Sequence, residues 1–233
     1  MDSLAHNFAD VSQRIEQAAQ RAGRDPREVK LIAVSKTVSS EAVLHAMSLG
    51  QDLFGENRVP ELEKKLRACP GAFFHLIGTL QTNKVNKVVG KVECIHSVDS
   101  LHLLEAINKR AQHLGIVQRV LLQVNVADEE SKHGFAPAEM QHILDEVGPM
   151  KNVLVNGLMT MAPHQDANEV RWVFRDLRSL CGSLQKYADA QGLTQVQLSE
   201  LSMGMSNDYE VAIEEGATYV RVGTSLFGQR NYE

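Results

Sequence analysis

The sequence repeats one pattern along most of its length: a short β-rich run, then a polar or glycine-containing turn, then a helical stretch. Eight such runs begin at Lys30, Asp52, Phe73, Cys94, Arg119, Leu154, Gln197 and Tyr219. Strands that alternate with helices pair in parallel through right-handed crossovers, and continuous apolar runs are typical of strands covered on both faces. Eight units within 233 residues therefore predict an α/β protein built as a single (β/α)8 TIM-like barrel.

An extra helix is predicted before the first run, because apolar residues recur there at steps of three and four. These residues are Leu4, Phe8, Val11, Ile15, Ala18 and Ala22. No helical pattern follows the eighth run, so we expect the N-terminal helix to cover the barrel at that point. A doubly wound open sheet is the main alternative, but no G-x-G-x-x-G sequence follows the first run, and the even number of units favours a closed barrel. No linker divides the chain, and we expect residues 1–233 to form one domain.

Charge and composition narrow the possible partners and the compartment. The formal net charge of −5 argues against a broad nucleic-acid-binding surface, and no run approaches the roughly 18 apolar residues that a membrane helix needs. The N-terminus lacks the basic and apolar regions of a signal peptide. Cys69, Cys94 and Cys181 fit buried positions in a reducing compartment, and the histidines show no metal-ligand spacing. We expect a cytoplasmic protein that holds no metal and contacts neither nucleic acid nor membrane.

The first run ends in a lysine, Lys36, within the sequence LIAVSKT. Taken alone, this position is explained by a side chain that reaches water past the end of a strand. Polar or glycine residues also follow or lie within six of the other seven runs, namely Glu56, Asn57, Gly78, Asn125, Thr160, His164, Ser202, Gly204 and Arg221. In a barrel these positions converge on the mouth where active sites lie. That convergence favours a functional lysine, whose amine attacks a carbonyl to form a Schiff base.

A second signal is the sequence LSMGMSND, in which Gly204 permits a tight turn and Ser206 precedes a helical pattern. Ser206 is explained by capping of that helix, but a hydroxyl beside glycine at a helix start also suits an anion. The eighth run adds Arg221, Gly223 and Thr224, and Gly223 lets backbone N–H groups approach a ligand. Phosphate sites in barrels are frequently built after strands seven and eight. A Schiff-base lysine opposite such a site matches the outline of pyridoxal 5′-phosphate (PLP).

Six motifs, spread from the first run to the eighth, carry a family resemblance: AVSKT, FGENRV, HLIGTLQTNK, GLMTMAP, LSMGMSND and VRVGTSLFG. Together and in this order they resemble the YggS/PROSC family, the pyridoxal phosphate homeostasis proteins, over essentially the whole chain. That family is similar to the N-terminal barrel of bacterial alanine racemase, the fold-type III architecture of PLP proteins. One departure is Pro60 in FGENRVPEL, where family members commonly carry glutamine. Proline is tolerated in the first turn of a helix, so we expect the fold to be unaffected.

The resemblance implies a set of cofactor-binding residues and no catalytic ones. Lys36 would carry PLP as a Schiff base, and Arg221 would face the pyridine nitrogen. The other implied residues are those that would hold the phosphate, Ser206 with the backbone of Gly223 and Thr224, and those that would line the pocket, Asn57 and His75.

The implied arginine bears on catalysis. Arginine stays protonated, so it donates to the ring nitrogen and leaves that nitrogen without a proton, which makes the ring a weak electron sink. Alanine racemase compensates for this weak electron sink with an acid/base tyrosine from a C-terminal β-domain. The sequence here ends at Glu233, directly after its last run. We therefore expect a non-catalytic protein that holds PLP and acts in vitamin B6 and amino-acid homeostasis. A fold-type III racemase or decarboxylase is one alternative, and a Schiff-base aldolase barrel without cofactor is another.

The resemblance also implies the partners. PLP itself would be the ligand, and PLP-dependent apo-enzymes would receive it. We expect a monomer, with a weak dimer as the alternative.

Overall fold

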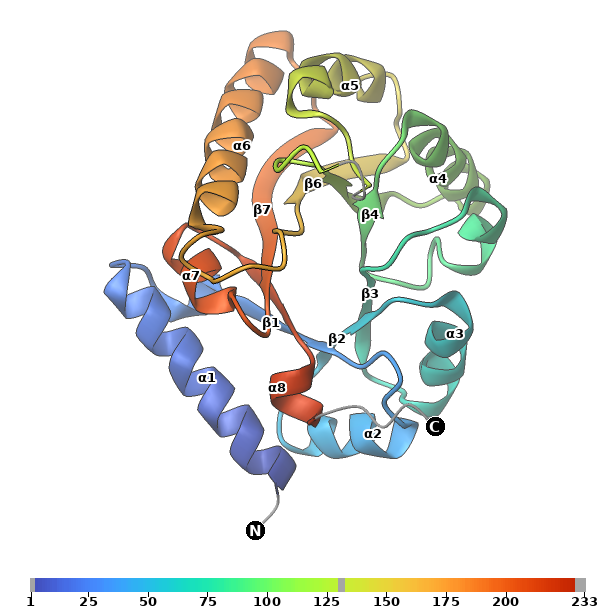
Figure 1. Cartoon of the computed structure of the whole chain (residues 1–233). Coiled ribbons are helices and arrows are strands. Elements are labelled where there is room, and N and C mark those ends of the chain that lie inside the picture. Colours follow the sequence, from blue (N-terminus) through green and yellow to red (C-terminus); the bar gives the residue numbers. More distant parts are fainter. Residues whose placement is uncertain (1–2, 130–132, 229–233) are drawn as a thin grey trace.

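Eight parallel strands form a closed barrel in the computed structural model, which describes residues 3–129 and 133–228 (Figure 1). The strands are β1 (Lys30–Val34), β2 (Leu53–Glu56), β3 (Phe73–Leu76), β4 (Cys94–Val98), β5 (Gln118–Gln123), β6 (Val153–Met159), β7 (Val196–Met205) and β8 (Tyr219–Val222). They pair in chain order, and β8 also pairs with β1, with Lys30 opposite Tyr219 and Ile32 opposite Arg221. The predicted (β/α)8 barrel is confirmed. The alternative of a doubly wound open sheet is wrong. An open sheet has two edge strands that pair on one side only, whereas β1 and β8 pair with each other here.

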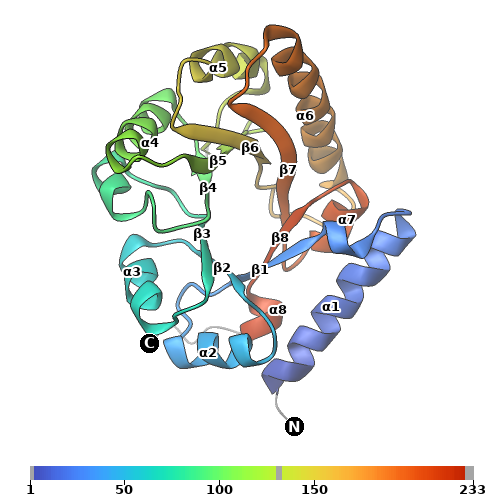
Figure 2. The same ribbon diagram turned by 180° about the vertical axis from the view of Figure 1, so that it is seen from behind.

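Helices surround the outside of the barrel (Figure 1, Figure 2). In chain order they are α1 (Ser3–Arg21), α2 (Ser40–Ser48), α3 (Val59–Ala68), α4 (Leu101–Leu114), α5 (Met140–Val147), α6 (Arg171–Gln191), α7 (Tyr209–Glu214) and α8 (Thr224–Phe227). Short 3₁₀ turns lie at η1 (Pro26–Glu28), η2 (Thr82–Lys87) and η3 (Pro137–Glu139). Local sequence explains several boundaries: Ser39 and Ser100 cap α2 and α4 through their side chains, and Pro60 lies in the first turn of α3.

One expectation about the end of the barrel is wrong, because a helix does follow the eighth strand. α8 is too short for a helical period to be visible in the sequence. α1 packs against both α7 and α8, and the rings of Phe8 and Phe227 meet edge to face with their centroids 6.0 Å apart. The N-terminal helix therefore covers this side of the barrel together with α7 and α8 rather than alone.

The main apolar core lies between the barrel wall and the helices, where Phe54, Phe74 and Phe174 are fully buried. The inside of the barrel is different. A small apolar cluster of Cys94, Leu121 and Met159 is present there, but the inside also holds buried polar side chains, namely His75, His96, Ser202 and Arg221. His96 on β4 and Ser202 on β7 are hydrogen bonded although these strands are not neighbours, so the contact crosses the barrel interior. Barrels are more often filled by branched apolar residues.

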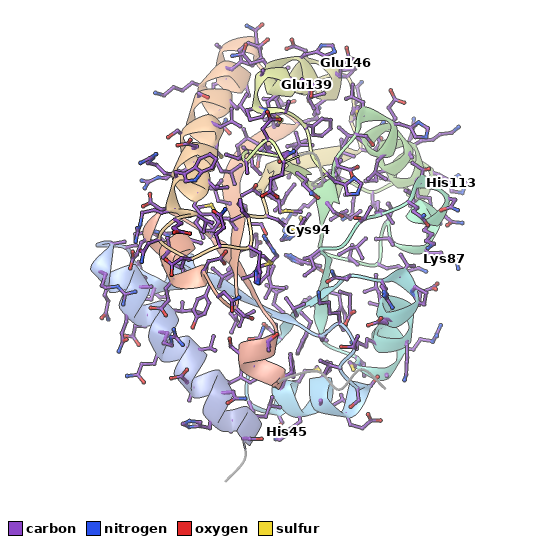
Figure 3. All side chains as sticks on the ribbon, viewed as in Figure 1. His45, Lys87, Cys94, His113, Glu139 and Glu146 are labelled. Atoms are coloured by element: carbon purple, nitrogen blue, oxygen red, sulfur yellow. The ribbon has the colours of Figure 1, made fainter. Side chains whose placement is uncertain are left out.

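Side chains lie both within the barrel and on its outer elements (Figure 3). Cys94 lies within the barrel, whereas His45, Lys87 and His113 lie on the outer elements (Figure 3). All three cysteines are free thiols in buried positions. Within the part of the chain that is described, no helix combines the length and the apolar character needed to cross a bilayer.

Candidate functional site

A cavity of about 420 Å³ opens at the carboxyl ends of the strands. The residues predicted from the sequence that line it are Lys36, Asn57, Ser206, Arg221, Gly223 and Thr224. They come from the ends of β1, β2, β7 and β8, which are far apart in the sequence and adjacent in the barrel. The barrel thus brings an amine, a guanidinium, an amide and a hydroxyl to one cavity.

Lys36 stands just after β1 and is half-buried at this cavity. The next residue, Thr37, has a φ of 63°, which is uncommon for any residue with a side chain. The Thr37 N–H donates to Glu61 Oε2 at 2.8 Å, which ties this turn to α3. The backbone that carries Lys36 is therefore fixed by a specific turn.

A buried ion pair supports the end of β1. The Lys65 ammonium donates to the Glu56 carboxylate and to the Ser35 carbonyl, and the Ser35 hydroxyl donates to Glu56 Oε1 at 2.6 Å. Burial raises the pKa of Glu56, against the opposing effect of the Lys65 ammonium. Glu56 was predicted at the barrel mouth, but it holds the residue before Lys36 instead of lining the cavity.

Ser206 and Gly223 join the ends of β7 and β8, since the Gly223 N–H donates to Ser206 Oγ at 3.2 Å. α7 begins only at Tyr209, and Ser206 is not its capping residue, so the capping interpretation of Ser206 is wrong. Gly204 has a φ of 90°, and a Cβ there would lie 2.6 Å from the Cβ of Ala212. The close packing of β7 on α7 thus requires glycine two residues before Ser206.

The Arg221 guanidinium is a fixed cation beside the cavity. The residue is 5% exposed, and it donates to Ser202 Oγ at 2.6 Å and to the Thr160 carbonyl at 2.9 Å. Burial lowers the pKa of Arg221 to about 10, while the Asp208 carboxylate acts in the opposite direction. Arg221 therefore remains protonated at neutral pH and can only donate hydrogen bonds.

Asn57 brings an unsatisfied acceptor to the cavity. Its Oδ1 is buried and receives no hydrogen bond from the described residues. A buried oxygen without a donor is costly, so this position suits a ligand or a water molecule. Gly78 packs directly on the Asn57 backbone, and a Cβ at Gly78 would overlap the Asn57 carbonyl oxygen.

His75 is the exception among the predicted site residues, because it does not line this cavity. It lines a separate hollow with Lys30, Phe73 and Tyr219, which are the first residues of β1, β3 and β8, so this hollow lies at the N-terminal end of the barrel. Ile77, two residues beyond His75, does line the cavity at the carboxyl ends of the strands. Side chains two residues apart share a face of a strand and lie about 6.6 Å apart along it.

His75 is nevertheless connected to Arg221 by hydrogen bonds. Its Nδ1 lies 2.8 Å from His96 Nε2, and His96 Nδ1 lies 2.9 Å from Ser202 Oγ. Ser202 Oγ is the atom that accepts from Arg221. We call this series His75–His96–Ser202–Arg221 the axial chain.

Several cavity residues were not predicted as site residues. They are Val34, Ile77, Met161, Ala162, Pro163, Gln165, Met205, Asn207 and Asp208, together with His164, which was considered only as a polar residue after the sixth run. Many are apolar and carry no chemical signal, so only the rule that the loops after barrel strands line the site could have found them. No group of three or more metal-ligating side chains occurs among residues 3–129 and 133–228.

Comparison with known proteins identifies the family. The family profile described as alanine racemase, N-terminal domain, matches residues 1–231. A pyridoxal phosphate homeostasis protein of Aquifex aeolicus (strain VF5) is 46% identical over 99% of this chain and 100% of its own. The chain belongs to the pyridoxal phosphate homeostasis protein family. The resemblance inferred from the six motifs is confirmed.

Solved structures agree with membership of the pyridoxal phosphate homeostasis family. PipY of Synechococcus elongatus PCC7942, solved with PLP bound, is 38% identical with a TM-score of 0.81, over 97% of this chain and 100% of PipY. Alanine racemase of Clostridium difficile 630 in complex with cycloserine is 16% identical with a TM-score of 0.72, over 100% of this chain and 61% of the racemase. At that identity the racemase supports the shared fold alone.

Proposed function

We propose that this protein holds PLP through a Schiff base on Lys36 and acts in vitamin B6 and amino-acid homeostasis without turning over a substrate. The observation that carries the proposal is the convergence of Lys36, Arg221 and the Ser206–Gly223 pair on one cavity. Two relatives add support: the Aquifex protein is named for pyridoxal phosphate homeostasis, and PipY was solved with PLP bound.

The residues of the cavity fit the parts of this cofactor. PLP supplies an aldehyde, with which a lysine amine condenses with loss of one water. The Ser206 oxygen accepts from Gly223, so its hydroxyl proton points elsewhere and can donate to a phosphate oxygen. We propose that the backbone of Gly223 and Thr224 completes the phosphate site, with the Gly223 N–H shared between Ser206 Oγ and a phosphate oxygen. Asn57, with its unsatisfied Oδ1, would lie at the edge of the bound group.

Arg221 is the reason for proposing a carrier rather than an enzyme. Its guanidinium is held by Ser202 and Thr160 and stays protonated. A donor of this kind leaves a pyridine nitrogen without a proton and so gives little stabilisation to a carbanion. His75 has no proposed contact with the cofactor; we propose that it acts indirectly, by supporting Arg221 through the axial chain.

The finer biological role is also a proposal. PLP-dependent apo-enzymes would receive the cofactor from this protein, which would work in the cytoplasm as a monomer. The free, buried cysteines support a reducing compartment.

The test is an absorbance spectrum of the purified full chain before and after addition of PLP, followed by borohydride reduction and peptide mass spectrometry. We expect a yellow protein with the reduced label on Lys36. Lys36→Ala should lose the label, and Lys91→Ala should keep it, because Lys91 is exposed and does not line the cavity. A colourless protein, or a label on another lysine, would overturn the proposal. Steady conversion of an amino acid that Lys36→Ala abolishes would show an enzyme instead.

A further inference from the structure

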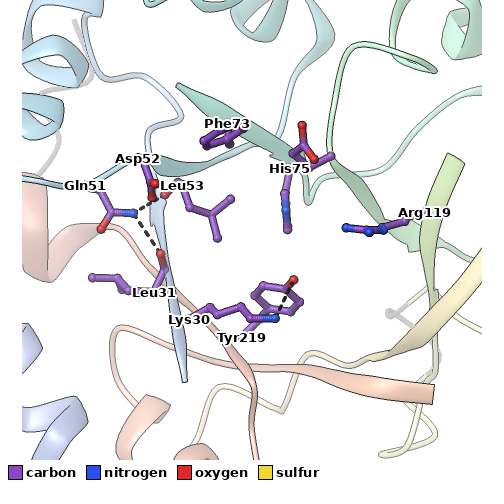
Figure 4. A pocket seen from close by; sticks show the side chains of 10 residues that line it. Lys30, Leu31, Gln51, Asp52, Leu53, Phe73, His75, Arg119 and Tyr219 are labelled. Carbon is purple, nitrogen blue, oxygen red and sulfur yellow. Dashed lines mark hydrogen bonds between the residues drawn. The ribbon is translucent and has the colours of Figure 1, made fainter. Parts of the chain in front are cut away.

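A second hollow opens at the opposite end of the barrel from the proposed PLP cavity. Figure 4 shows the side chains that line it. Its volume is about 440 Å³. A smaller recess of about 80 Å³ adjoins it and shares the residues Lys30, His75, Glu93, Arg119 and Tyr219. We call this space the lower hollow. Barrel enzymes place their chemistry at the C-terminal ends of the strands. The fold by itself therefore gives no reason for polar groups to gather at the N-terminal end.

The axial chain fixes what His75 presents to the lower hollow. Arg221 can only donate, so Ser202 Oγ accepts from it. The Ser202 hydroxyl proton then goes to His96 Nδ1, which is its only acceptor among the described residues. His96 therefore carries its proton on Nε2 and donates to His75 Nδ1. The remaining nitrogen of a neutral His75, Nε2, must then carry a proton and act as a donor.

This donor belongs to a buried residue that faces the lower hollow. His75 is 4% exposed and lines both the hollow and its recess. Its Nε2 has no hydrogen-bond partner among the described residues. The ring also packs edge to face on Tyr219, with centroids 5.3 Å apart, which fixes its orientation.

Arg119 supplies a second free donor group beside His75. Figure 4 shows the Arg119 side chain reaching into the hollow from β5 toward His75, and both residues align with Cys94 in the register of β3, β4 and β5. Across residues 3–129 and 133–228, the Arg119 guanidinium forms no ion pair or hydrogen bond. The hollow's other cation is already compensated: Lys30 Nζ lies 2.6 Å from Glu200 Oε1. His75 Nε2 and the Arg119 guanidinium are thus two donor groups at the lower hollow that have no acceptor among the described residues.

The other residues that line the lower hollow determine which kind of anion fits it. Leu31, Leu53 and Phe73 form an apolar side, and Phe73 is 49% exposed. The carboxylates of Asp52 and Glu93 also line the hollow and are exposed. Their negative charge opposes a phosphate dianion more than a single carboxylate. The best match is therefore a small monocarboxylate with an apolar body.

We infer that the lower hollow is a binding site for a small monocarboxylate, whose carboxylate accepts from the Arg119 guanidinium and from His75 Nε2–H while its apolar body packs on Leu53 and Phe73. The site is separate from the proposed PLP cavity and does not depend on PLP binding. Two metabolite classes share this chemistry, the 2-oxo acids and the amino acids. They differ in the ammonium group, which Asp52 and Glu93 would attract.

The test is an NMR titration of the full chain with 4-methylpentanoate. The histidines are labelled with ¹⁵N, and the signals of the His75 ring nitrogens are followed. We expect a saturable shift of His75 Nε2. The neutral amide 4-methylpentanamide should bind at least about tenfold more weakly, because it offers no charge-assisted hydrogen bond. L-leucine and 4-methyl-2-oxopentanoate then distinguish the two classes: whichever binds more tightly identifies the class, and both outcomes support the site.

Variants give an independent check. Arg119→Gln should weaken binding of 4-methylpentanoate by at least about tenfold. Arg175→Gln, an exposed arginine on α6, should leave it unchanged. The inference is overturned if the folded wild-type protein shows no saturable shift of His75, if inorganic phosphate binds as tightly as the carboxylate, or if Arg119→Gln binds like the wild type. None of these readouts involves PLP, so failure here and failure of the proposed function are distinguishable.

Discussion

Arg221 on β8 donates a 2.6 Å hydrogen bond to the hydroxyl of Ser202 on β7, and this contact links the two ends of the barrel. Toward the carboxyl ends of the strands, Arg221 lines the proposed PLP cavity. Below it, Ser202 continues through His96 to His75, which lines the lower hollow. Because every link is buried, removing one leaves its neighbours with polar groups that water cannot satisfy.

Ser202→Ala should destabilise the protein. The change removes the acceptor of Arg221 and the donor to His96 at once. A buried polar group left unpaired costs about 1–3 kcal/mol, so we expect a loss of that size in the free energy of unfolding, measured by urea denaturation. Ser183→Ala is the matched control, since Ser183 is exposed on α6 and should change stability by less than about 0.5 kcal/mol. Equal stability of the two variants would show that the axial chain contributes nothing.

Acidification should destabilise the protein through its two interior histidines. Burial, followed by the positive charges of Lys30 and Arg119, lowers the pKa of His75 to about 3. Burial, followed by His75 and Arg221, lowers the pKa of His96 well below its usual value. In the unfolded chain both titrate near 6.5, so below about pH 6.5 the unfolded state binds more protons. The free energy of unfolding should then fall by up to about 1.4 kcal/mol per pH unit for each histidine, measured by urea denaturation at a series of pH values.

Variants separate this effect from that of the carboxyl groups. Burial raises the pKa of Glu56 and Asp208, and groups of this kind favour the folded state as the pH falls, which is the opposite sign. His75→Gln should reduce the slope, because glutamine can still accept from His96 but does not titrate, while the contribution of His96 remains. His113→Gln, at an exposed position of α4, should leave the slope as in the wild type. A wild-type slope in His75→Gln would contradict the assignment.

The sequence predicted the fold well because the signals it depends on are local. Runs of apolar residues and the turns between them mark strands and helices wherever they occur, and eight units specified a closed barrel. α8 was missed since a single turn has no period to detect. Lys36 and Arg221 were found because a charge within or beside an apolar strand is a conspicuous exception.

The depth of residues inside the barrel could not be predicted in the same way. Strands buried on both faces do not alternate apolar and polar residues, so nothing in the run around His75 indicated how far along the barrel axis its side chain lies. The pairing of Glu56 with Lys65 and the axial chain depend on contacts between distant segments. Such contacts follow from the three-dimensional register, which no single run specifies.

The buried ion pair of Glu56 and Lys65 should contribute far more to the free energy of unfolding than an exposed ion pair does. Lys65→Met leaves the Glu56 carboxylate buried without its cation, and breaking a buried pair in this way costs about 3–5 kcal/mol. Lys87→Met is the matched control, because Lys87 is exposed and lies 3.9 Å from Glu63, a pair worth about 0–1 kcal/mol at most. Thermal and urea unfolding measure both variants. Similar losses in the two would refute a special role for the buried pair.

Two glycine-to-alanine changes should have opposite effects. At Gly78 a Cβ would overlap the backbone of Asn57, which cannot move without disturbing the cavity, so we expect lower stability and weaker PLP binding. Gly182 lies within α6 with open space around it, and alanine there should raise the free energy of unfolding by about 0.5–1 kcal/mol. Calorimetry and a PLP titration check both. A Gly78→Ala protein that binds PLP like the wild type would show that the contact with Asn57 does not shape the site.

Lys36→Ala should weaken PLP binding without abolishing it. The substitution removes the amine but leaves Ser206, Gly223 and Arg221 in place, and hydrogen bonds to a charged phosphate are among the stronger ones in proteins. Equilibrium dialysis should therefore give measurable but reduced affinity for Lys36→Ala, and a further large loss for Lys36→Ala combined with Ser206→Ala. If the single variant bound PLP as tightly as the wild type, the Schiff base would not be the anchor. If the double variant lost nothing more, the Ser206 hydroxyl would not hold the phosphate.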